Sequence, residues 1–260
     1  MKLIQHLINL LTVCKIALVT TFSAALLWSC GEKKQDASES GLSGRYVNNT
    51  FLQSIPDSIP GLVPAFCYEL NFISEDSVNV FFGFEEATLA YKKQGNHYLI
   101  MKAMQDKDMT LLLNEDQTLS LVDTAWTSQN TPSEFKKVAM VSGQKWEFEN
   151  YLNQQMIAGS YTVYQQDQPT DQKISFKTDG TITGISDYIS YSICYSGDCV
   201  GEVYPTSNTM TLTNAKKESV TYAFVKSKGS NKISVYNIEA PIPDMKGERA
   251  IKELVYDLRK

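Results

Sequence analysis

Histidine and cysteine are the residue types through which this chain could most readily do chemistry, and both are scarce. The sequence has two histidines and five cysteines, namely His6, His97, Cys14, Cys30, Cys67, Cys194 and Cys199. A hydrolase triad or a histidine metal site needs a histidine beside further reactive groups. His97 follows a Gln-Gly-Asn turn, which is typical of a solvent-facing loop. We therefore predict that the protein is not an enzyme and has no catalytic residue, no metal site and no cofactor.

The N-terminal segment predicts a secretory signal. Lys2 and Lys15 flank apolar chain, and Ile16–Trp28 is an uncharged run of 13 residues. A helix that crosses a bilayer needs about 20 apolar residues, whereas the core of a signal peptide needs about 7 to 15. A short buried helix is the alternative, but it would not explain why Cys30 is followed by Gly-Glu-Lys-Lys. The run length and the polar continuation favour a signal peptide over residues 1–29.

The end of this segment resembles the lipobox of bacterial lipoproteins. Leu27-Trp28-Ser29-Cys30 places an aliphatic residue three positions before the cysteine and a small residue directly before it. The resemblance implies that Cys30 is acylated, that the first 29 residues are removed and that lipid holds the chain at a membrane. Two or three acyl chains hold a protein firmly, whereas one gives marginal binding. By the same resemblance, Gly31 after the cysteine implies the outer membrane, on its periplasmic or its exposed face.

Residues 30–43 are expected to form a flexible tether between the lipid and the folded chain. The stretch from Gly31 to Ser43 is polar and has too few bulky groups to form a core. Taking the two lysines of the signal peptide from 24 basic residues leaves 22 against 29 acidic residues, a formal charge of −7. This balance argues against nucleic acid as a partner.

The remaining chain contains an internal repeat. Gly44-Arg45-Tyr46 and Gly159-Ser160-Tyr161 each open a stretch in which apolar and polar residues alternate between turn residues. The aligned positions are Leu70, Phe72 and Val78 with Ile174, Phe176 and Ile182. Alternation with tight turns predicts antiparallel hairpins, and helical periodicity is clear only over residues 144–157. We predict an all-β protein with a short connecting helix, its halves being closed meander barrels or, alternatively, β-sandwich halves.

The two halves resemble small lipocalin-like domains, which begin with Gly-x-Trp where this chain has Gly-x-Tyr. The resemblance implies two small antiparallel meander β-barrels. Residues 44–140 would form the first, residues 141–158 a linker with the helix, and residues 159–260 the second. It also implies barrels that bind small apolar molecules, although a fold by itself does not establish a function.

Two cysteines of the second half are placed to form a disulfide. Cys194 and Cys199 bracket Tyr-Ser-Gly-Asp in "ICYSGDCV", which predicts the tip of a hairpin. Cysteines across such a loop reach the Cα separation of roughly 5.5 Å that a disulfide needs, and the cell envelope is oxidising. We predict a structural disulfide; the alternative is a redox pair or a soft-metal site, although the spacing is not C-x-x-C. Cys67 is expected to face a core as a small hydrophobic residue.

The candidate ligand-binding residues lie in a connection of the first half that is 11 residues longer than its counterpart in the second half. Pro56, Pro60 and Pro64 argue against a regular helix or a central strand there. The apolar candidates are Phe51, Leu52, Ile55, Ile59, Leu62 and Phe66. In lipocalins the matching connection covers the barrel mouth, which implies a pocket beneath it. Alternatively, the segment plugs the barrel or packs between the halves without a ligand.

Two functions are expected from these features. The first is a non-catalytic lipoprotein that binds a small apolar ligand in a β-barrel. The second is an accessory or assembly module that contacts another envelope protein and has no small-molecule ligand. In both, lipidated Cys30 makes the membrane contact.

Overall fold

The computed structural model describes residues 42–104, 106–122, 133–141, 145–196, 206–226, 231–240 and 248–260. The chain from Gly41 to Lys260 forms one compact unit. It contains two sheets of eight strands and short helices, which confirms the all-β prediction. The expected signal peptide and Cys30 lie outside the described residues, so the lipid anchor stays a prediction. No helix in the described ranges has the length and apolar character needed to span a membrane.

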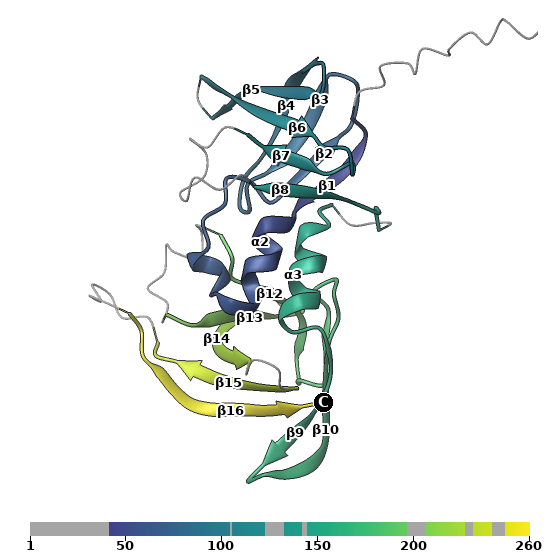
Figure 1. Cartoon of the computed structure of the whole chain (residues 1–260). Helices are drawn as coiled ribbons and strands as arrows, with labels where there is room; N and C mark the ends of the chain where they lie inside the picture. The colour runs from purple at the N-terminus through teal and green to yellow at the C-terminus, as the bar shows by residue number, and fades with distance from the viewer. Residues whose placement is uncertain are drawn as a thin grey trace, which may run out of the picture. The chain divides into compact units, whose positions relative to one another are not determined.

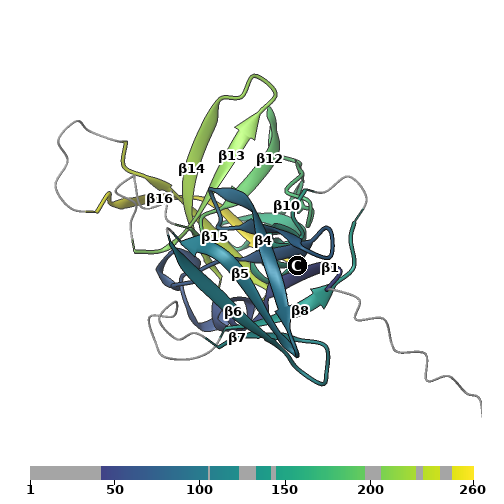
Figure 2. The ribbon, with the colours of Figure 1, turned by 90° about the horizontal axis from the view of Figure 1, so that it is seen from above.

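The first half forms a closed antiparallel barrel (Figures 1 and 2). Its strands are β1 (Gly44–Asn48), β2 (Glu69–Phe72), β3 (Ser77–Phe81), β4 (Glu86–Gln94), β5 (His97–Met104), β6 (Lys107–Leu113), β7 (Leu119–Leu121) and β8 (Glu134–Val138). Each strand pairs with the next one, and β1 pairs with β8, which removes the open edges. The predicted first barrel is therefore confirmed.

Alternating side chains fill the interior of this barrel. In β3, for example, Val78 and Val80 are buried whereas Ser77 and Asn79 are only partly buried, as expected for a strand with one face on a core. The buried cluster comprises Leu42, Tyr46, Cys67, Leu70, Phe72, Val78, Val80, Tyr91, Tyr98, Ile100, Ala103, Met109, Leu111, Leu119, Leu121 and Phe135. Cys67 is a buried free cysteine in this core, as predicted.

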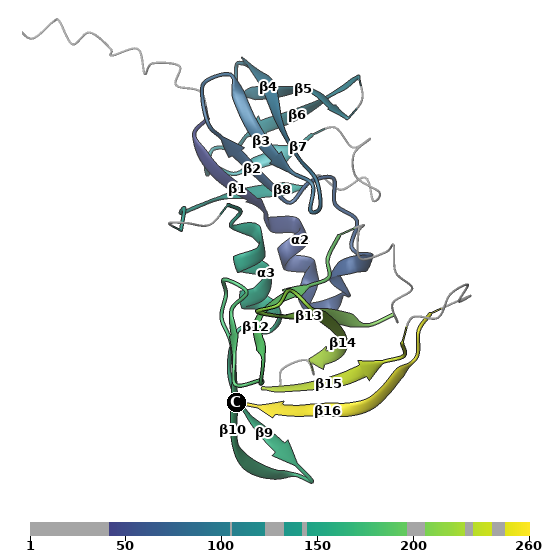
Figure 3. The same cartoon turned by 180° about the vertical axis from the view of Figure 1, so that it is seen from behind.

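The second half forms an eight-stranded antiparallel sheet that is not closed (Figure 3). Its strands are β9 (Gly159–Gln165), β10 (Gln168–Phe176), β11 (Ile182–Thr183), β12 (Tyr188–Ile193), β13 (Asn208–Asn214), β14 (Ser219–Lys226), β15 (Lys232–Ile238) and β16 (Ile251–Arg259). β9 pairs with β16, as β1 pairs with β8. The edge strands of this sheet are β11 and β12. One isolated bridge, between Thr181 just before β11 and Ser190 of β12, connects the two edges.

A second closed barrel is therefore not confirmed, because the chain around β11 meets β12 at only one isolated bridge. β11 has only two residues, so it offers little edge for pairing with β12. Gly184 follows it with a φ of +90°, and a Cβ atom there would lie 1.8 Å from the carbonyl oxygen of Lys173. The chain at Gly184 thus lies tightly against β10. We call the line where β11 and β12 fail to pair the seam.

The two halves begin with the same strand register. In the first, Gly44 lies opposite Phe72 and Tyr46 opposite Leu70. In the second, Gly159 lies opposite Phe176 and Tyr161 opposite Ile174. Because a shift of one residue would move every side chain to the other face, this shared register fixes which residues enter each core.

Each half also contains the same set of three aromatic side chains. The first triad is Tyr46, Phe72 and Tyr91, and the second triad is Tyr161, Phe176 and Tyr191. In the first triad the successive ring centroids lie 5.7 and 5.1 Å apart, and in the second 6.1 and 5.2 Å apart, all in edge-to-face geometry. Such pairs add to the stability that burial alone gives.

Two short helices lie next to each other (Figures 1 and 3). α3 (Phe148–Met156) is the connecting helix predicted from periodicity. α2 (Asn49–Ser54) was not predicted, because the prolines of this segment argued against a helix. It begins where the Asn48 side chain accepts a hydrogen bond of 2.9 Å from the Phe51 backbone and ends before Pro56. Two 3-10 turns then accommodate the prolines, η1 (Ile55–Asp57) and η2 (Pro60–Leu62).

Candidate functional site

Three of the six residues predicted to contact a ligand lie in a protein core. Phe51, Leu52 and Ile55 are 2%, 0% and 3% exposed. They belong to a buried cluster that also contains Phe148 of α3 and Ile174 of β10. The Phe51 and Phe148 rings lie 5.5 Å apart. These three side chains therefore pack between elements of both halves, which is the arrangement expected if the segment holds no ligand.

The other three candidates are not brought together with them. Ile59 is partly buried, and Phe66 is partly buried with its ring 5.5 Å from that of Phe82. Leu62, the last residue of η2, is 67% exposed. None of the three pockets described below is lined by any of the six candidates. A ligand beneath this segment stays a prediction.

Large side chains occupy the interior of the first barrel. Tyr46, Tyr98 and Phe135 are among the largest fully buried residues of the described chain. No residue of the barrel core lines any of the three pockets. The described interior of the barrel is thus occupied by large, fully buried side chains.

The predicted disulfide involves one described cysteine. Cys194 follows β12, but Cys199 lies outside the described residues, so their bridge stays a prediction. A Cβ atom at Gly61 of η2 would lie 3.6 Å from Cys194 Sγ, which places η2 beside this position. Burial raises the pKa of the Cys67 thiol, so Cys67 stays protonated and unreactive.

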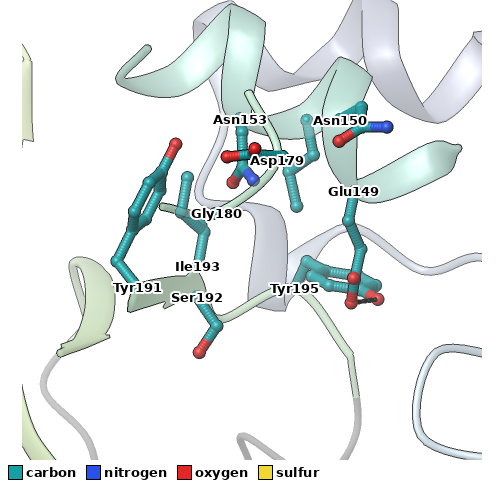
Figure 4. Close-up of a pocket in the computed structure, with 10 residues that line it drawn as sticks. Glu149, Asn150, Asn153, Asp179, Gly180, Tyr191, Ser192, Ile193 and Tyr195 are labelled. Carbon is teal, nitrogen blue, oxygen red and sulfur yellow. Dashed lines mark hydrogen bonds between the residues drawn. The ribbon is translucent and has the colours of Figure 1, made fainter. Parts of the chain in front are cut away.

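A cavity of about 80 Å³, which we call the seam pocket, lies beside β12 (Figure 4). Its walls come from α3, from the turn between β10 and β11, and from β12 with the residue shortly after it. The lining residues are Glu149, Asn150, Leu152, Asn153, Asp179, Gly180, Tyr191, Ser192, Ile193 and Tyr195. Along the seam β12 meets the chain just before β11 at one isolated bridge, and residues of α3 line the pocket beside it.

Hydrogen bonds hold the polar side chains of the seam pocket in place. The amide of Asn153 donates to the Thr178 carbonyl at 2.8 Å. The Tyr191 hydroxyl donates to the Lys177 carbonyl at 2.6 Å. The Tyr195 hydroxyl donates to Glu149 Oε1 at 3.0 Å. These bonds tie α3, the turn and the β12 region together across the seam.

The electrostatics of the seam pocket do not favour proton transfer near neutral pH. Hydrogen bonding from Thr181 lowers the pKa of Asp179. Burial, with the Glu149 carboxylate close by, raises the pKa of Tyr195, and burial also raises the pKa of Tyr191. Efficient acid–base catalysis uses groups whose pKa lies near the working pH. The pocket offers a charged carboxylate and neutral phenols, and its volume suits a few water molecules.

A wider pocket of about 490 Å³ shares Asn150 and Asp179 with the seam pocket. Its other lining residues are Val141, Glu147, Tyr151, Gln154 and Thr178. Glu147 is buried, and its carboxylate accepts hydrogen bonds from the Val141 backbone at 2.6 Å and from the Asn150 amide at 2.9 Å. Its hydrogen-bonding capacity therefore serves to hold the chain before α3.

A third pocket, the outer groove, lies on the outer face of the first barrel and has a volume of about 290 Å³. It is lined by Arg45, Asn71, Asn79, Glu86, Ala87, Thr88, Lys145 and Trp146. These residues come from strands β1 to β4 and from the chain just before α3. The groove combines amide, hydroxyl and charged groups with one indole ring.

Sequence reasoning did not single out Glu69, which is the most unusual acid of the described chain. It is fully buried, and its Oε2 accepts hydrogen bonds from the backbone of Glu147 at 2.6 Å and of Phe148 at 2.8 Å. Its Oε1 lies 3.2 Å from Arg45 Nη1. Burial raises the pKa of Glu69 to about 7, although the hydrogen bond from Phe148 and the charge of Arg45 oppose this shift. Glu69 thus attaches β2 of the barrel to the start of α3.

Metal-binding and histidine chemistry find no support in the described ranges. Within them, no three His, Cys, Asp or Glu side chains are grouped to hold a metal ion. His97 is exposed at the start of β5.

No protein-family model, curated protein or solved structure matches this chain.

Proposed function

We propose that the protein is a lipid-anchored, non-catalytic module of the cell envelope that contacts another envelope protein through its outer surface. The observation that carries this proposal is the filling of its interior. The barrel core is packed with side chains such as Tyr98 and Phe135, and Phe51 and Leu52 of the apolar segment are buried in the second cluster. Binding then depends on the outer surface.

The anchor part of the proposal is supported by the sequence around Cys30. An uncharged run of 13 residues, the lipobox-like Leu27-Trp28-Ser29-Cys30 and the polar stretch after it agree with an acylated cysteine and a tether. Acylation with two or three chains would keep the chain at the outer membrane. Its partner would then be another protein of the same envelope.

Leu62 is the proposed centre of the protein contact. It is 67% exposed, yet Pro60 before it is buried and Val63 after it packs against a core cluster. A residue whose neighbours on both sides are held loses little backbone freedom on binding. This property favours the protein-contact function over the apolar-ligand function, for which the described pockets, lined mainly by polar residues, give less support.

We also propose a more detailed fold for the two halves. Both halves are repeats of one lipocalin-like meander of eight strands, and the second repeat is a barrel opened at its seam. The shared register of Gly44 and Gly159 supports this assignment, as do the two aromatic triads.

Photo-crosslinking in cells tests the contact. The full-length chain is produced with a photo-reactive amino acid in place of Leu62 and, as the matched control, in place of Val225, which is 45% exposed on β14. We expect one discrete adduct with an envelope protein from position 62 and none from position 225. The absence of an adduct at position 62, or the same adducts at both positions, would refute the contact.

Cell fractionation tests the anchor separately. The wild-type chain should sediment with outer membranes. The Cys30→Ser chain should either remain an uncleaved precursor or appear in the soluble fraction. A Cys30→Ser chain that still sediments with the outer membrane in processed form would contradict the lipid anchor and leave the contact test unaffected.

A further inference from the structure

A row of polar side chains crosses the outer face of the first barrel. Arg45, Asn71, Asn79 and Thr88 lie at directly paired positions on β1, β2, β3 and β4. Because neighbouring strands are about 4.8 Å apart, the row is roughly 14 Å long. These four residues line the outer groove together with Trp146. Its volume of about 290 Å³ is close to the lower limit of small-molecule sites, about 300 Å³.

The indole ring of Trp146 is held at the groove by two contacts. It stacks on Phe81 with the ring centroids 4.8 Å apart and the planes inclined by 10°. Its Nε1–H donates to Glu86 Oε2 at 3.0 Å. The ring is therefore oriented before any ligand arrives, which lowers the entropic cost of binding.

The groove also has hydrogen-bonding groups without partners among the described residues. The Thr88 hydroxyl donates to Asn79 Oδ1 at 2.8 Å, which leaves the NH₂ group of Asn79 available. Within the same described ranges, the side-chain amide of Asn71 makes no hydrogen bond. An amide can both donate and accept, so the row suits a ligand that carries donors and acceptors close together.

Each cation of the groove lies beside a carboxyl group. Arg45 lies 3.2 Å from Glu69, and Lys145 Nζ lies 2.5 Å from Glu86 Oε1. A free phosphate or an organic cation would have to compete with these pairs. The groove therefore favours a neutral ligand over a charged one.

We infer that the outer groove binds a neutral carbohydrate. Asn71, Asn79 and Thr88 would exchange hydrogen bonds with sugar hydroxyl groups, and the indole ring of Trp146 would cover the apolar C–H face of a sugar ring, removing both from water. A row of roughly 14 Å has space for more than one sugar unit. This inference does not depend on the lipid anchor or on the contact at Leu62.

The second half provides a matched control. Its corresponding row is Ser160, Ser175 and Thr183, paired on β9, β10 and β11. The hydroxyl groups of Ser160 and Ser175 already bond to each other at 3.0 Å. None of the three pockets lies over this row.

Calorimetric titration of the full-length chain with defined glycans tests the inference. The chain is kept in a polyoxyethylene detergent, because detergents with sugar head groups would compete. The probes are neutral maltotriose, mannotriose and chitotriose, with sialyllactose and glucose 6-phosphate as charged comparisons. We expect at least one neutral trisaccharide to bind and Asn71→Ala combined with Asn79→Ala to weaken it at least about 5-fold, from the loss of two hydrogen bonds.

Ser175→Ala combined with Thr183→Ala should leave the affinity unchanged. Circular dichroism checks that each variant is folded, and if the Asn71/Asn79 variant is not, Thr88→Ala should weaken binding by about 2-fold. The inference is overturned if no neutral trisaccharide binds, if only the charged probes bind, or if the folded Asn71/Asn79 variant binds as tightly as the wild type.

Discussion

In the first half, β3 has five residues and pairs with β4 at five positions. In the second half β11 has two residues, and Thr181 just before it meets β12 at one isolated bridge. The opening strands are otherwise alike, since β1 pairs with β8 and β9 with β16. The two sheets therefore differ at their third strands, β3 and β11. β11 pairs with β10 at two positions, and only the bridge at Thr181 reaches β12.

The second strands of the two halves, β2 and β10, also differ in the burial of one side chain. Glu69 of β2 lies opposite Val47 and is fully buried under the start of α3. Lys173 of β10 lies opposite Thr162, in the corresponding register, and is exposed. The single connecting helix is therefore attached to the outer face of the first barrel, while its apolar side packs against residues of the second sheet.

The largest expected effect concerns the core that the two halves share. Phe148→Ala should lower the free energy of unfolding by about 4 kcal/mol, because the ring is fully buried and contacts Phe51, Tyr68 and Tyr195. Urea unfolding followed by circular dichroism should show one transition that shifts as a whole. Gln154→Ala, on the exposed side of α3, is the control and should have little effect. Two separate transitions, one of them unchanged in Phe148→Ala, would mean that the halves are independent.

The second prediction tests the burial of Glu69. Burial raises the pKa of Glu69 to about 7, above the value of about 4.3 in an unfolded chain. The folded state therefore holds a proton that the unfolded state has released. The contribution of this proton to the free energy of unfolding is present below about pH 4 and is lost as the pH rises through 7. The free energy of unfolding should fall by an amount of order 3 kcal/mol between these limits.

Urea unfolding at a series of pH values measures this dependence. Glu69→Gln should remove it, whereas Lys173→Gln at the corresponding exposed position should leave it unchanged. A wild-type stability that rises between pH 5 and 8, or an unchanged slope in Glu69→Gln, would contradict the assignment.

The third prediction concerns the seam. Gly184→Ala should cost about 2 to 3 kcal/mol, because the new Cβ atom would meet the Lys173 carbonyl oxygen in a left-handed backbone conformation. Gly95→Ala is the matched control, since Gly95 has a φ of +66° and no atom lies within 4 Å of the place that its Cβ atom would take. It should cost about 1 kcal/mol for the left-handed conformation alone. The free energies of unfolding are measured by urea unfolding. Equal decreases in the two variants would show that the close approach to β10 does not affect stability.

The smallest expected change in stability comes from removing one tyrosine hydroxyl group, and it should be equal in the two halves. The Tyr91 hydroxyl donates to the Ser74 carbonyl at 3.0 Å, and the Tyr191 hydroxyl donates to the Lys177 carbonyl at 2.6 Å. Tyr91→Phe and Tyr191→Phe each remove one hydrogen bond and should each cost about 1 kcal/mol. Thermal unfolding of the two variants provides the comparison. A loss in only one of them would break the equivalence of the aromatic triads.

The sequence by itself determined the features that depend on neighbours along the chain. Alternation and turn residues determined the hairpins, and Leu70 and Ile174, which align in the sequence, lie at the same register position in the two halves. Apolar periodicity determined α3, from Phe148 to Met156. These properties arise from local backbone preference and from which face of a strand or helix is apolar, and both can be followed in sequence order.

Only the tertiary structure decided the closure of each sheet and the role of the apolar segment. Composition showed that Phe51, Leu52 and Ile55 must be covered, but their partners Phe148 and Ile174 are distant in sequence. The burial of Glu69 depends on where α3 begins, and the seam lies where β11 ends after two residues. Hydrophobic attraction is non-directional, so a sequence indicates which side chains leave water while long-range packing determines the surfaces that they meet.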